Sequence, residues 1–169
     1  MQKLNSKMLA RLGIIAGLYV ALSVLVLPLA SGAIQIRFGE AMTLLPLFFP
    51  EACISLFVGC IIVNVISGCA LLEVIIGAVI TLMAGVLTAI IGKVIKKKVL
   101  KIIVGGIFPI VLNALLLPLV WYICYGVLEY VYYIQVLLIF LGQAIAVYGI
   151  GSIAFISLEK IEKKGKLNS

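Results

Sequence analysis

The chain has 169 residues, of which 65% are hydrophobic and 11% charged, and its formal net charge is +7. A mean hydropathy of +1.36 excludes a soluble globular domain, because too little polar surface would remain to face water. The length corresponds to a single domain, and nearly uncharged runs of about 20 residues are typical of membrane spans.

Six apolar segments follow one another, and each ends at a turn or charge signal. The first ends before Ser31-Gly32, the second stops at Pro50, the third at Gly68, and the fourth at the basic run 93–101. Backbone groups in hydrocarbon must be satisfied within the segment, and no segment alternates with the period of a strand, so helices are predicted. The expected spans are 8–29, 36–49, 51–67, 71–92, 102–125 and 132–158. We therefore expect an all-α integral membrane domain over residues 1–169, a bundle of six transmembrane helices.

The basic residues divide unevenly between the two ends of these spans. All of the 13 lysines and arginines except Arg37 fall at the N-terminus, in the 93–101 connection or in the C-terminal tail. Cytoplasmic loops are enriched in Lys and Arg, so both termini are predicted to be cytoplasmic. The positive charge is better explained by this topology than by a nucleic-acid partner.

Arg37 and Glu40 lie three residues apart at the opposite, outer end of the second span. An interfacial ion pair is the simple explanation, and such a pair contributes only about 0.3–0.5 kcal/mol. Glu73 falls at the same level. Polar groups at membrane depth are costly unless they have a partner, which makes these residues candidates for a site that opens outward.

Amide and aromatic side chains add to this level. Asn64, Asn113 and Gln143 occur within three different spans, where they are candidates either for interhelical hydrogen bonds or for ligand binding. Trp121 and Tyr125 are four residues apart on one helix face. They fit an interfacial aromatic belt, or stacking on a flat ligand.

Gly13, Gly17 and Ala21 form a small-residue stripe with four-residue spacing in the first span. Such a stripe permits close helix contact. Packing within the chain and docking of a partner subunit are the two interpretations.

Several chemistries have no support in the sequence. The chain contains no histidine and no aspartate, no GxxxxGK[ST] phosphate-binding loop and no GxSxG motif. Its four cysteines contain no CxxC spacing and read as small apolar residues. We expect no catalytic residues, no metal site, no cofactor in this chain and no nucleic-acid partner.

Four segments resemble QueT-type proteins, the substrate-binding S components of energy-coupling factor (ECF) transporters assigned to queuosine precursors. The segment IQIRFGEAMTLLPLFFPEA (34–52) carries the most specific likeness, and 56–91, 111–115 and 141–143 extend it. The resemblance implies a multi-pass subunit of the bacterial cell membrane that binds its ligand near the extracellular face. It implies as partners a transmembrane coupling protein, docked on Gly13, Gly17 and Ala21, and two cytoplasmic ATP-binding subunits that use ATP.

The ligand that the resemblance implies is a deazaguanine, such as the aminomethyl form. A carboxylate accepts two adjacent N–H groups of a guanine edge, and a second carboxylate would suit a cationic substituent. Glu40 and Glu73 are the candidates for these roles, with Arg37 as the residue that orients Glu40. The other expected ligand-binding residues are Asn64, Asn113, Gln143, Trp121 and Tyr125.

Three other interpretations stay open at the level of sequence. The same architecture could bind another vitamin or nucleobase-like ligand. A stand-alone secondary transporter would work without ATP-binding partners, and internal inverted repeats, which are typical of that class, are not evident. A scaffold protein would bind no small molecule.

Overall fold

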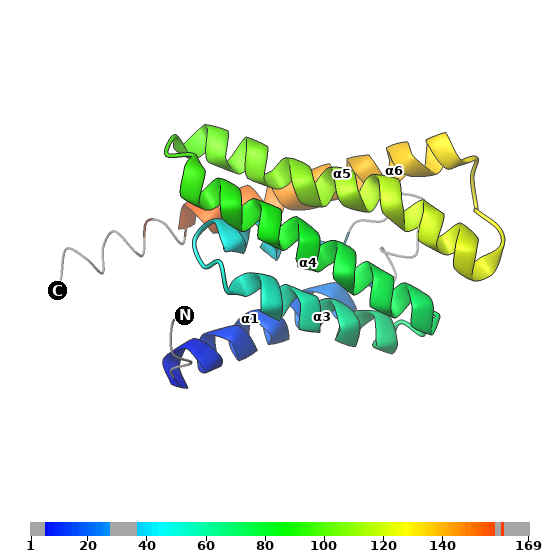
Figure 1. The fold of residues 1–169 in the computed structure, drawn as a ribbon, viewed down its shortest axis with the longest axis horizontal. Coiled ribbons are helices and arrows are strands. Elements are labelled where there is room, and N and C mark those ends of the chain that lie inside the picture. The colour runs from blue at the N-terminus through cyan, green and yellow to red at the C-terminus, as the bar shows by residue number, and fades with distance from the viewer. Residues whose placement is uncertain (1–5, 28–36, 158–159, 161–169) are drawn as a thin grey trace.

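The structure is a computed structural model that describes residues 6–27, 37–157 and 160, and these residues form a helical bundle without strands (Figure 1). Four helices are long and apolar enough to cross a membrane, and a shorter apolar helix accompanies them. The elements are α1 (Ser6–Leu25), η1 (Phe38–Leu47), α3 (Ala52–Ile66), α4 (Leu71–Val94), α5 (Lys98–Tyr125), α6 (Tyr132–Ala144) and η2 (Ile145–Gly151). A last helical stretch continues η2 to residue 157.

The helices agree closely with the predicted spans. Helix α5 begins a full turn earlier than predicted, at Lys98 rather than 102. The end of the first predicted span, the start of the second, the Ser31-Gly32 turn and residue 158 lie outside the described residues.

The second predicted span is a 3₁₀ helix, η1, and it is the most enclosed element of the bundle. Eight of its ten residues are buried. At about 2.0 Å per residue it measures roughly 20 Å, against a hydrocarbon core of about 30 Å. Glycines of its neighbours permit this close approach: a Cβ at Gly92 would lie 2.6 Å from the carbonyl oxygen of Leu47, and one at Gly151 would lie 2.6 Å from that of Ala41.

In the bundle α3 lies beside α1 and α4, and α5 lies beside α4 and α6. Helices α1 and α3 run in the same direction, whereas α3, α4, α5 and α6 alternate in direction (Figure 1). The start of α1, the α4–α5 connection and the end of η2 therefore lie at one end of the bundle. Because that connection contains Lys96 and Lys97, we call this the lysine end. The α3–α4 and α5–α6 connections lie at the other end.

An ion pair fastens α1 to the start of α3 at the lysine end. Arg11 Nη1 lies 3.1 Å from Glu51 Oε1, and the Arg11 guanidinium stands 4.5 Å from the centre of the Phe49 ring. No other ion pair within 4 Å joins two residues that are both described by the structure.

Candidate functional site

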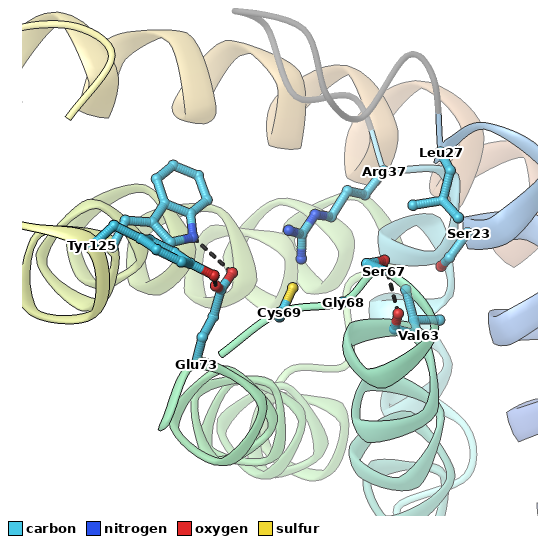
Figure 2. A pocket seen from close by; sticks show the side chains of 10 residues that line it. Ser23, Leu27, Arg37, Val63, Ser67, Gly68, Cys69, Glu73 and Tyr125 are labelled. Carbon is cyan, nitrogen blue, oxygen red and sulfur yellow. Dashed lines mark hydrogen bonds between the residues drawn. The ribbon is translucent and has the colours of Figure 1, made fainter. Parts of the chain in front are cut away.

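A cavity of about 330 Å³ opens at the end of the bundle opposite the lysine end. The C-terminal turns of α1, α3 and α5 and the first turn of α4 surround it. Its polar lining includes Arg37, Cys69, Glu73, Trp121 and Tyr125, which come from four different elements or connections (Figure 2). We call it the Glu73 cavity.

Glu73 lies in the first turn of α4, where the helix dipole favours a negative charge. Its carboxylate accepts hydrogen bonds from Trp121 Nε1 at 2.8 Å and from the Tyr125 hydroxyl at 2.6 Å (Figure 2). The Tyr125 oxygen in turn accepts the backbone N–H of Ala70 at 3.1 Å. The four-residue spacing of the two aromatic residues on α5 thus places both donors on one carboxylate. Their rings stand at the wall of the cavity.

Arg37 reaches into the cavity from the opposite side and points toward Glu73 and Tyr125, with Cys69 between them (Figure 2). It forms no ion pair with Glu40 among the described residues, so the interfacial Arg37–Glu40 pair considered from the sequence is not formed. Burial, together with a smaller contribution from the nearby Glu73 carboxylate, raises the pKa of the Cys69 thiol to about 11. Cys69 is therefore a neutral thiol at physiological pH, and the cavity has a cationic side and an anionic side.

Glu40 belongs to a second polar group, the Glu40 cluster, made of Glu40, Tyr19 and Asn113. Its carboxylate, only 2% exposed, accepts the Tyr19 hydroxyl at 2.7 Å and Asn113 Nδ2 at 3.3 Å. Tyr19 packs closely against Gly39 and Gly59: a Cβ at Gly59 would lie 2.8 Å from Tyr19 Cδ1, and one at Gly39 would lie 3.2 Å from Tyr19 Cε2 and collide with Ser23 Oγ. Glu40 does not line the Glu73 cavity.

The chain matches the family described as QueT transporter over residues 9–160. The chain belongs to the QueT transporter family. It is accordingly a multi-pass membrane protein and a component of a transporter. Comparison with curated proteins and with solved structures found no match.

The remaining amides of this QueT-family protein lie apart from the Glu73 cavity. Asn64 is buried between α3 and α4, where its Nδ2 lies 3.5 Å from Cys60 Sγ and would lie 3.1 Å from a Cβ added at Gly77. Gln143 is buried on α6, and its Oε1 has no hydrogen-bond donor. The structure thus gathers four predicted site residues around one cavity, two in the Glu40 cluster, and leaves two elsewhere.

The small residues of α1 face outward. Gly13, Gly17 and Ala21 are exposed and line a shallow groove together with Ile62 and Ile66 of α3. A Cβ at Gly13 or Gly17 would meet nothing within 4 Å. Close packing within the described part of this QueT-family chain therefore does not explain the glycines.

Tyr19 is the functional candidate that the sequence did not single out. It occupies the middle of the buried α1 stripe Ile15, Tyr19 and Ser23. Tyr19 and Ser23 are polar residues on an otherwise apolar buried face, and this was the available signal. The partner of Tyr19, Glu40, is 21 residues away and could not be inferred from a local pattern.

Proposed function

We propose that this QueT-family protein is the substrate-binding S component of an ECF-type importer, and that its ligand is a queuosine precursor of the deazaguanine class, such as the aminomethyl form. The observation that carries the proposal is the Glu73 cavity, which combines an arginine, a carboxylate and an indole. Its volume is at the lower end of the range of small-molecule sites, which suits a bicyclic base.

The distribution of charge supports a cavity that opens to the outside of a bacterial cell. The cavity and the lysine end are at opposite ends of the bundle. The positive-inside rule assigns a lysine-rich connection to the cytoplasm. In this orientation six helices, with η1 as a short and protein-enclosed one, place both termini in the cytoplasm.

The chemistry of the lining residues supports a guanine-like ligand. Glu73 uses two of its roughly four acceptor positions for Trp121 and Tyr125, and the others remain for two adjacent N–H groups of a guanine edge. Arg37 would donate to the carbonyl oxygen of the base, and Trp121 would stack on its flat face. Glu40, the other carboxylate expected to bind ligand, does not line this cavity and accepts hydrogen bonds from Tyr19 and Asn113 instead.

The exposed small-residue groove of α1 supports docking of a transmembrane coupling protein, because close helix approach needs small side chains. The chain has no phosphate-binding loop of its own. Two cytoplasmic ATP-binding subunits would therefore supply the energy for import, through the coupling protein.

A thermal-shift screen on the purified protein tests the ligand. We expect aminomethyl-deazaguanine at 100 times its Kd to stabilise the protein by about 2.7 kcal/mol. Riboflavin, thiamine and biotin, at the same concentration, should give no shift. Stabilisation by one of these vitamins alone would show an S component with another ligand, and no stabilisation by any compound would reject the proposal.

An uptake measurement in cells tests the coupling. Accumulation of labelled precursor should require co-expression of the coupling protein and both ATP-binding subunits. Equal uptake by this protein alone would identify a stand-alone transporter instead.

A further inference from the structure

A second polar residue of α6 has the same unusual environment as Gln143. Gln135 is 2% exposed and Gln143 is 1% exposed. The Oε1 atoms of both side chains are buried without a hydrogen-bond donor. A buried acceptor without a donor is destabilising, and such groups are rare in native proteins. Two of them on one helix call for a donor that the described part of the chain does not supply.

The two glutamines lie on the face of α6 that looks into the bundle. They stand eight residues apart, with Ile139 between them, and Ile139 packs with Ala114 and Leu117 of α5 and with Ile80 of α4. This face is therefore directed at the same helices that carry Glu73, Trp121 and Asn113.

Apolar contacts fix the level of Gln135 in the bundle. Val136, the next residue of α6, and Trp121 of α5 both pack against the buried cluster that contains Ile139. Gln135 therefore lies near the level of Trp121, the residue that links Glu73 to α5.

We infer that the inward face of α6 forms one wall of the ligand site, and that Gln135 is a specificity-determining residue whose Oε1 accepts an N–H group of the ligand. The inference rests on the proposed function and deepens it, because it assigns a ligand contact to a residue outside the Glu73 cavity. Deazaguanines present several N–H donors: the ring N–H groups, the exocyclic amine and, in the aminomethyl form, an ammonium. A ligand rich in donors is the chemical complement of buried acceptors that lack them.

The test is Gln135→Leu, compared with wild type by calorimetric titration with aminomethyl-deazaguanine and by thermal unfolding without ligand. Leucine is of similar size and removes the unpaired acceptor. We expect the Kd to rise about 10- to 100-fold, the loss for a hydrogen bond to a polar or charged donor. The unfolding midpoint of the ligand-free protein should stay the same or rise, because no internal hydrogen bond is lost.

Ser55→Ala is the matched control. Ser55, in the half of α3 nearer the lysine end, is also buried with an unpartnered oxygen, and its removal should leave the Kd unchanged. A Gln135→Leu protein that binds within twofold of wild type would overturn the inference. So would a loss of affinity that accompanies a lowered midpoint of the ligand-free protein, because it would show a structural role. Wild-type protein that fails to bind any deazaguanine would reject the proposed function, and the inference with it.

Discussion

Glu73→Gln removes the carboxylate that joins α4 to α5 at the mouth of the cavity. Glutamine keeps one acceptor oxygen, but its NH₂ group would face one of the two donors, Trp121 Nε1 or the Tyr125 hydroxyl. Tyr125 is half exposed, so its hydrogen bond is the weaker contribution, and the bond from the partly buried indole dominates. Loss of about one hydrogen bond to a charged acceptor costs roughly 2 kcal/mol.

For a chain of this size, roughly 2 kcal/mol corresponds to a fall of about 4–8 °C in the midpoint of thermal unfolding. The assay is thermal unfolding of the purified protein, with Glu129→Gln as the control, because Glu129 is exposed in the α5–α6 connection at the same end. We expect the control to melt within about 1 °C of wild type. Equal midpoints for both variants would refute the assignment of Glu73 as the residue that ties α4 to α5.

Three further changes test other parts of the structure. Tyr19→Phe removes one of the two buried donors to Glu40 and should lower the free energy of unfolding by about 2 kcal/mol, measured by denaturant titration. Gly92→Ala places a methyl group 2.6 Å from the Leu47 carbonyl oxygen and should cost about 1–3 kcal/mol in the same titration, because backbone must shift. In a variant whose other three cysteines are replaced by alanine, Cys69 should react with a maleimide on the order of tenfold more slowly at pH 7.5 than an exposed thiol. The reaction rate should increase up to about pH 11, because only the thiolate reacts.

Each of these has an outcome that contradicts it. A Tyr19→Phe protein as stable as wild type would mean that the hydrogen bond from the Tyr19 hydroxyl does not stabilise the Glu40 cluster. Gly13→Ala, where a methyl group meets nothing within 4 Å, is the control for Gly92→Ala. An equal decrease in the free energy of unfolding for both variants would argue against tight packing around η1. A Cys69 alkylation rate that levels off near pH 8.5, the ordinary thiol range, would show that the thiol is not shielded.

The sequence predicted the helices well because its signals were local. Uninterrupted apolar runs mark the helices, and helix ends are marked by Pro50, Gly68 and the lysine run. Helices α3, α4 and α6 begin within one residue of the predicted positions. The 3₁₀ form of η1 was not predicted. It depends on how closely α4 and η2 approach it, which is a tertiary property.

The candidate site was predicted only in part, for the same reason. Residue type and depth were sufficient to select Glu73, Trp121, Tyr125 and Arg37. Which polar groups pair with one another was not accessible, because Glu40 and Asn113 are 73 residues apart. Local spacing suggested Arg37 as the partner of Glu40, whereas the fold supplies Tyr19 and Asn113.

Trp121 offers the most direct test of ligand binding at the Glu73 cavity, because it is the single tryptophan of the chain and lines that cavity. We propose a titration of the purified protein with aminomethyl-deazaguanine, with the emission of Trp121 recorded at each step. The account predicts a saturable change in emission with one ligand bound per chain, weakened at least tenfold in Glu73→Gln. Saturable binding by calorimetry without any change in Trp121 emission would locate the ligand elsewhere, and no binding by either method would contradict the account as a whole.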